Sequence, residues 1–305
     1  MVLDFQPIGR YARCSVQKIA SGKSLVQARL ASASLKLADV DVLLFYTFAL
    51  FAVGGVQRFL DAYLHAAQWT AFDAVILHEV NAGELLAFVA LFSVLKSKAA
   101  AVRLSSVDLV IISACAMFFL FPKQSLPFVG ASIAGVYFWR RRPYNAQLAS
   151  AGQLWLAISV YRFWGRLFFQ IVCAPIIQAE AFVIAKVGQL LGLGLSLDGI
   201  RINSPNGWFV YLMDGCSSFH NASLAVLVWL SLVKLAGSRV SGSKLMALGI
   251  GILAIVCLNA LRILLMTPSE EAYLFWHEGS GATLFSCLTL GAIAIPTTIS
   301  LRLRS

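Results

Sequence analysis

Three polar residues in the last third of the chain have side chains that could together carry out acyl transfer. They are Cys216, Arg262 and His277, and each lies beside a long apolar run. A cysteine attacks a carbonyl carbon as its thiolate, and a helix N-terminus or a neighbouring cation favours that anion. A histidine can protonate the leaving amine, and an arginine can stabilise the oxyanion of the tetrahedral intermediate. The three residue types therefore indicate a nucleophile, a general acid/base and an electrostatic stabiliser.

These side chains converge only if the apolar runs cross a membrane. Hydrophobic residues make up 59% of the 305 residues and charged residues only 12%, whereas roughly a quarter of a soluble domain is charged. We therefore expect an all-α polytopic membrane protein with about eight transmembrane helices in one bundle. The expected spans are 41–60, 74–95, 107–121, 126–139, 148–173, 216–233, 245–266 and 278–299. Because successive spans alternate in direction, the three side chains fall at one depth, the outer membrane–water boundary.

The distribution of charge predicts the orientation of the bundle. The net charge is +10, and the cations gather in short clusters between apolar runs. Such clusters stay on the cytoplasmic side. We therefore predict a multi-pass protein of the cell (inner) membrane with both termini in the cytoplasm, residues 1–38 as a basic cytoplasmic tail and residues 39–305 as the bundle. The positive-inside rule also explains the basic charge without a nucleic-acid partner.

The segment that precedes the sixth span is expected on the outer face, over residues 176–213. Residues 176–193 are long enough to cross the membrane, but Glu180 and Lys186 interrupt them, and a charge near the bilayer centre costs roughly 3 kcal/mol. We predict an interfacial helix that starts after Pro175. The Ser-Pro-Asn-Gly turn sequence between two apolar stretches predicts a small β-hairpin over residues 197–212.

The ordered set of motifs resembles the exosortase/archaeosortase family of multispanning membrane enzymes. Members carry a cysteine in a CSG-type motif, an arginine in an NxxR-type motif and a histidine in an HxxxG-type motif. The matching stretches are Cys216-Ser217-Ser218, Asn259-Ala260-Leu261-Arg262 and His277-Glu278-Gly279-Ser280-Gly281. Asp214 stands where members often have an acidic residue. Ser218 replaces the usual glycine, and its side chain could narrow the approach to the thiol.

The resemblance implies a cysteine protease or transpeptidase, an exosortase-like hydrolase that cleaves C-terminal sorting signals of exported proteins through a thioester. Its partners would be membrane lipids and exported proteins that end in a short motif, a transmembrane helix and a basic cluster. By this resemblance Cys216 is the nucleophile, His277 the general acid/base and Arg262 the stabiliser. The supporting residues are Asp214, Ser217 and Asn259. No Cys/His spacing suits zinc, so we expect neither metal nor cofactor.

His220 is an alternative base that the sequence leaves open. It follows Cys216 by four residues, so the two side chains would share one face if both residues were helical.

The second span leaves open other functions. It holds His78, Glu79, Asn81 and Glu84, and ionisable groups inside a span are candidates for a transport path, although they often only line the bundle interior. The alternatives are therefore a small-solute or lipid-linked transporter, and a catalytically silent assembly factor for export of surface protein or polysaccharide.

Overall fold

The computed structural model describes residues 43–57, 82–96, 105–121, 125–141 and 146–303. The predicted tail 1–38 lies outside these residues, as do His78, Glu79 and Asn81. Within them the chain is mainly helical. Its α-helices are Leu43–Gln57, α3 (Ala82–Lys96), α4 (Ser106–Phe119), α5 (Leu126–Arg140), α6 (Ala146–Ser159), α7 (Gly165–Leu190), α8 (Ser218–Leu235), α9 (Gly242–Met266), α10 (Glu270–His277) and α11 (Ser280–Arg302).

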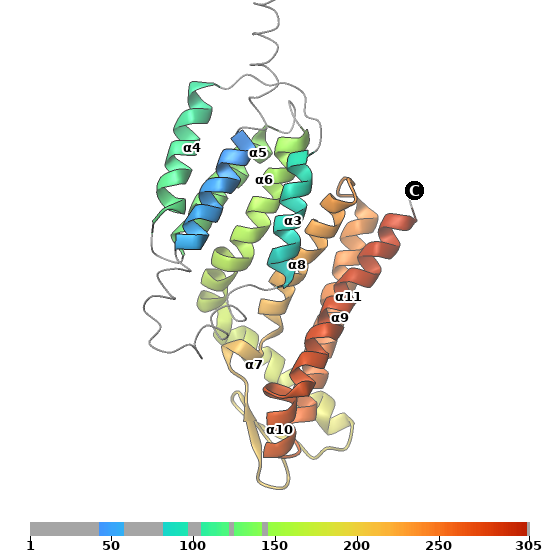
Figure 1. Cartoon of the computed structure of the whole chain (residues 1–305). Coiled ribbons are helices and arrows are strands. Elements are labelled where there is room, and N and C mark those ends of the chain that lie inside the picture. The colour runs from blue at the N-terminus through green and yellow to red at the C-terminus, as the bar shows by residue number, and fades with distance from the viewer. Residues whose placement is uncertain (1–42, 58–81, 97–104, 122–124, 142–145, 304–305) are drawn as a thin grey trace, which may run out of the picture.

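Most of these helices run side by side in one bundle, which Figure 1 shows with the C-terminus at its upper end. In the described part of the chain, four helical stretches are long and apolar enough to cross a membrane. They are Ala146–Leu190, Ser218–Leu235, Gly242–Met266 and Ser280–Arg302. Three apolar helices, Leu43–Gln57, α3 and α4, are shorter. The fold is therefore consistent with the predicted helical membrane protein, and helix length and composition identify four spans within the described residues, so the count of eight stays a prediction.

Glycine allows α5 and α6 to pack backbone against backbone. A Cβ atom on Gly152 of α6 would lie 2.6 Å from the backbone nitrogen of Trp139 and 2.7 Å from the carbonyl oxygen of Gly135, both in α5. Lipid tails are as apolar as leucine, so helices in a membrane associate through this kind of close packing rather than through the hydrophobic effect. The α5–α6 pair is therefore held by contact that only a residue without a side chain permits.

The prediction of a separate helix that starts after Pro175 is wrong. The chain stays helical from Ala146 to Leu190, and Pro175 lies inside α7. The interruption comes earlier, at the π-helical segment η1 (Val160–Trp164) between α6 and α7. Proline within an apolar helix removes one backbone hydrogen bond and is tolerated where neighbouring groups compensate. In Figure 1, the axis of α7 points in a different direction from that of α6, and α7 lies at the lower end of the molecule.

The predicted hairpin is present as part of a three-stranded antiparallel sheet with the order β1-β2-β3. Its strands are β1 (Ser196–Asp198), β2 (Arg201–Asn203) and β3 (Phe209–Tyr211). The Ser-Pro-Asn-Gly turn joins β2 to β3, with Gly207 at a φ of +87°, a conformation that glycine adopts without strain. The sheet contacts α7 and lies beside α10 at the lower end of the molecule (Figure 1).

We expect the substitution Gly152→Ala to lower the free energy of unfolding by about 1–3 kcal/mol, because the added methyl group forces α5 and α6 apart. The measurement is denaturant unfolding of the purified chain in one detergent. Gly249→Ala is the matched control, because a Cβ atom there meets nothing within 4 Å and alanine favours the helix by about 0.5–1 kcal/mol. Equal stability of the two variants would contradict the close packing of α5 and α6.

Candidate active site

Three helix ends meet at the end of the bundle that carries α10 and the sheet. There α8 begins, α9 ends and α11 begins, and α10 contacts both α9 and α11; Figure 1 shows these ends together. The fold therefore brings Cys216, Arg262 and His277 to the same end of the molecule, as the alternation of apolar runs predicts.

Cys216 lies in a short turn immediately before α8. It is the last residue of the 3-10 segment η2 (Asp214–Cys216) and is half-buried. Its backbone nitrogen donates to the carbonyl of Met213 at 2.9 Å. Ser217 is the N-cap of α8, and its hydroxyl accepts a hydrogen bond from the backbone nitrogen of Phe219. The thiol-bearing residue thus precedes the first backbone N–H groups of a helix, which favour an anion.

Asn259 of α9 holds the backbone of this turn. Its side-chain nitrogen donates to the carbonyl of Cys216 at 2.7 Å and to the hydroxyl of Ser218 at 3.2 Å. Both Asn259 and Ser218 are buried. The hydroxyl of Ser218 is therefore directed at α9 and supplies an acceptor for the asparagine that holds the Cys216 turn.

Glu180 holds the other side of the turn, and sequence reasoning missed it. Its Oε1 accepts a hydrogen bond from the backbone nitrogen of Ser218 at 3.0 Å. A carboxylate beside the first N–H groups of α8 is favourable because those groups lack partners within the helix. In the sequence Glu180 is only a polar interruption of an apolar run, and nothing there indicates that α7 returns to the start of α8.

Arg262 lies between the turn that holds Cys216 and the end of α10. It is half-buried and follows Asn259 by one turn of α9. Its Nε donates to the carbonyl of Trp276 at 2.9 Å, and Nη2 donates to the carbonyl of His277 at 3.2 Å. The guanidinium charge also interacts electrostatically with Cys216. One side chain therefore contacts the helix that ends in His277 and lies within electrostatic range of Cys216.

His277 packs against an aromatic neighbour that sequence reasoning also missed. The rings of His277 and Tyr273 are stacked, with centroids 4.8 Å apart and planes 12° apart. Nδ1 of His277 lies 3.7 Å from Oε1 of Glu278 and has no hydrogen-bond partner in the described part of the chain. Burial raises the pKa of Tyr273, and the charges of Cys216 and Glu278 add to this while Arg262 opposes it. The only feature of the sequence that could have predicted this ring contact is the position of Tyr273 four residues before His277.

His220 does not share a helix face with Cys216, because Cys216 precedes α8. The helical basis for pairing the two is therefore wrong. The imidazole of His220 lies beside the ring of Tyr161 in η1, with centroids 5.4 Å apart. Within the described residues the Cys216 thiol makes no hydrogen bond to either histidine. Catalytic hydrogen bonds are often long before substrate binds and shorten in the complex.

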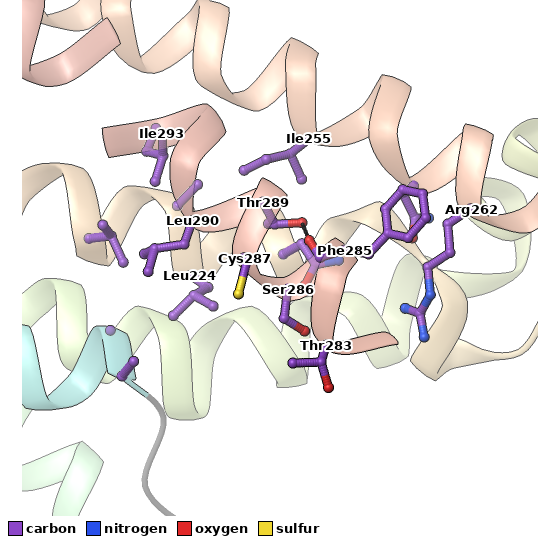
Figure 2. A pocket seen from close by; sticks show the side chains of 16 residues that line it. Leu224, Ile255, Arg262, Thr283, Phe285, Ser286, Cys287, Thr289, Leu290 and Ile293 are labelled. Carbon is purple, nitrogen blue, oxygen red and sulfur yellow. Dashed lines mark hydrogen bonds between the residues drawn. The ribbon is translucent and has the colours of Figure 1, made fainter. Parts of the chain in front are cut away.

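A cavity of about 330 Å³ extends from Arg262 into the bundle. It lies between the start of α3 and the helices α8, α9 and α11. Figure 2 shows Arg262 at one end of the cavity and the apolar side chains of Leu290 and Ile293 towards the other. Thr283 and Ser286 line it near the arginine. The cavity is therefore polar where it meets the candidate site and apolar farther into the bundle.

Glu84 is the one polar residue singled out in the second predicted span that the structure describes. It is buried, and its carboxylate forms a forked ion pair with Arg162 of η1. The ion pair between Glu84 and Arg162 therefore links α3 to the junction of α6 and α7. No group of three His, Cys, Asp or Glu residues suited to a metal ion occurs in the described ranges.

Neither a model of a protein family, nor a curated protein, nor a solved structure matches the chain. The family resemblance therefore depends on the residues quoted above and on their order.

We expect Asn259→Ala to loosen the Cys216 turn, because the carbonyl of Cys216 loses its donor. The lost hydrogen bonds should cost about 1–3 kcal/mol of unfolding free energy. Alkylation of the thiol, measured in a variant whose other cysteines are replaced by alanine, should also become severalfold faster. Asn221→Ala is the control, because Asn221 lines the same cavity and makes no hydrogen bond within the described residues. Unchanged alkylation in Asn259→Ala would show that the asparagine does not position the cysteine.

Proposed function

We propose that the chain is a membrane-embedded cysteine peptidase or transpeptidase that cleaves C-terminal sorting signals of exported proteins. The observation that carries the proposal is the placement of Arg262, which donates hydrogen bonds to the end of the helix that carries His277 and lies one helical turn from Asn259, the residue bonded to the Cys216 carbonyl. The motif resemblance supplies the reaction class, and the fold supplies the convergence of residues that are far apart in the chain.

In the first half of the proposed reaction, the Cys216 thiolate attacks the carbonyl carbon of the scissile peptide bond. The C–S bond forms as the carbonyl electron pair moves to oxygen, and Arg262 stabilises the resulting oxyanion. The tetrahedral intermediate then collapses and the C–N bond breaks. The departing amine takes a proton from the His277 imidazolium. The products are a thioester on Cys216 and the released C-terminal segment.

In the second half, the neutral imidazole of His277 removes a proton from the incoming nucleophile. Attack on the thioester carbon expels the Cys216 thiolate and regenerates the enzyme. Water as the nucleophile gives hydrolysis, and an amine gives transpeptidation. Neither half of the reaction needs an oxidant, a reductant or a metal ion.

The topology that fits this reaction has eight spans, both termini in the cytoplasm and the site at the outer membrane–water boundary. The loop between α8 and α9 supports this orientation. It carries Arg239 and lies between Lys234 and Lys244, at the end of the bundle away from α10 (Figure 1). Basic loops stay in the cytoplasm. The apolar part of the cavity beside Arg262 suits the apolar residues that would begin the transmembrane helix of a substrate.

A transporter and a catalytically silent assembly factor remain the alternatives, and both would tolerate the loss of Cys216. Glu84 forms an ion pair with Arg162, which gives Glu84 a structural role. The presence of Glu84 in the second predicted span therefore adds no support for a transport path.

Cleavage of a substrate separates these functions. The probe is an exported host protein that ends in a short motif, a transmembrane helix and a basic cluster, co-expressed with the chain and sized on a gel. We expect wild type to shorten it, and Cys216→Ala and His277→Ala to leave it intact, because each lacks a reacting group. His220→Ala should retain most of the activity, and Cys257→Ala is the control for loss of a thiol elsewhere, because Cys257 is exposed and lines neither described cavity. Cleavage by Cys216→Ala would refute the proposal, and loss of activity only in His220→Ala would reassign the base.

Tyr273 is expected to position the imidazole of His277 through ring stacking. Tyr273→Ala should lower kcat by on the order of tenfold with little change in KM, because a misplaced base slows proton transfer. Tyr273→Phe keeps the stacked ring and should stay within about threefold of wild type. The measurement is the rate of cleavage at several substrate concentrations. Equal losses in the two variants would assign the role to the phenol hydroxyl instead of the ring.

A further inference from the structure

A second cavity, of about 290 Å³, lies beside the Cys216 turn, between α7 and the start of α8. Its polar lining comes from Arg166 and Gln170 of α7 and from His220 and Ser223 of α8. Gly215, the residue next to Cys216, also lines it. None of these residues takes part in the reaction proposed above.

The walls of this cavity are built by close packing at the junction of η1 and α7. A Cβ atom on Gly165 would lie 2.7 Å from the carbonyl oxygen of Val160 and 3.6 Å from Cβ of Ser223. The absence of a side chain therefore relieves a clash with the carbonyl of Val160 in η1, and the start of α7 lies in ordinary contact with Ser223 of α8. Phe169 and Phe219 stack with centroids 5.2 Å apart and planes 17° apart, and both line the cavity. A π-helical segment such as η1 frequently marks a functional site.

The charge around the cavity is positive and incompletely balanced. Arg162 and Arg166 are one helical turn apart, and both charges act on His220. Glu84 pairs with Arg162, whereas Arg166 forms no ion pair with any described residue. Among the described side chains that line the cavity, none is acidic. A guanidinium close to lipid is costly without a counter-charge, so the cavity is suited to an anionic group.

We propose that this cavity binds the phosphate of an anionic phospholipid. The planar guanidinium of Arg166 matches two phosphate oxygens, and His220 and Gln170 carry further hydrogen-bond donors, whereas the hydroxyl of Ser223 donates to the carbonyl of His220 at 2.8 Å. Basic pockets between transmembrane helices bind lipid headgroups. The cavity lies at the end of the bundle where α8 begins, which is the depth of the headgroups if α8 crosses the membrane. This proposal does not depend on the reaction assigned to Cys216.

The test is native mass spectrometry of the purified full-length chain titrated with phosphatidylglycerol or with phosphatidylcholine. We expect wild type to retain one phosphatidylglycerol about tenfold more tightly than phosphatidylcholine. Arg166→Gln should lose this preference, and His220→Gln should weaken it. Arg140→Gln is the matched control, because Arg140 is an exposed arginine at the end of α5 and lines neither cavity. Thermal unfolding of each variant separates a loss of binding from a loss of fold.

Two outcomes would overturn the proposal. Retention of phosphatidylglycerol by Arg166→Gln and His220→Gln at wild-type affinity would show that the lipid binds elsewhere. Displacement of the lipid by inorganic phosphate at equal concentration would assign the cavity to free phosphate rather than to a phospholipid. Failure of substrate cleavage would leave the lipid result unaffected, because the binding measurement requires no turnover.

Discussion

The pair of hydrogen bonds from Arg262 to the last carbonyls of α10 is the interaction on which the candidate site depends. The final carbonyls of a helix lack partners within that helix, and a half-buried guanidinium is costly unless its N–H groups are satisfied. The guanidinium N–H groups of Arg262 and the last carbonyls of α10 therefore satisfy each other's hydrogen-bonding capacity. As a consequence, α10 is held against α9, and His277 stays at the same end of the bundle as Cys216.

The cysteine turn is held through its backbone and leaves the sulfur atom free to react. Asn259 binds the carbonyl of Cys216, and Glu180 binds the backbone nitrogen of Ser218. These groups come from α9 and α7, so the turn is held from two sides. A nucleophile benefits from this arrangement because its position is set before the substrate arrives, while no hydrogen bond from a described residue has to break before the sulfur attacks.

Sequence alone predicts the convergence of Cys216, Arg262 and His277, because apolar runs that alternate in direction place their ends at two levels. It does not predict the contacts that refine the site. The helix continues through Pro175 because the change of direction occurs at η1, and a π-helical segment has no clear sequence signal. The contacts of Glu180 and Tyr273 depend on how α7, α9 and α10 are placed relative to one another. That placement follows from packing and cannot be inferred from the spacing of residues within one helix.

Two cavities of different character adjoin the Cys216 turn, and this difference bears on the proposed chemistry. Asn259, which binds the carbonyl of Cys216, lines the largely apolar cavity, whereas Gly215 lines the basic one. A transmembrane segment of a protein substrate is apolar and a lipid headgroup is anionic, so the two ligands would not compete for one surface. In the proposed reaction, a lipid bound beside Gly215 would therefore leave the cavity beside Arg262 open to the departing segment.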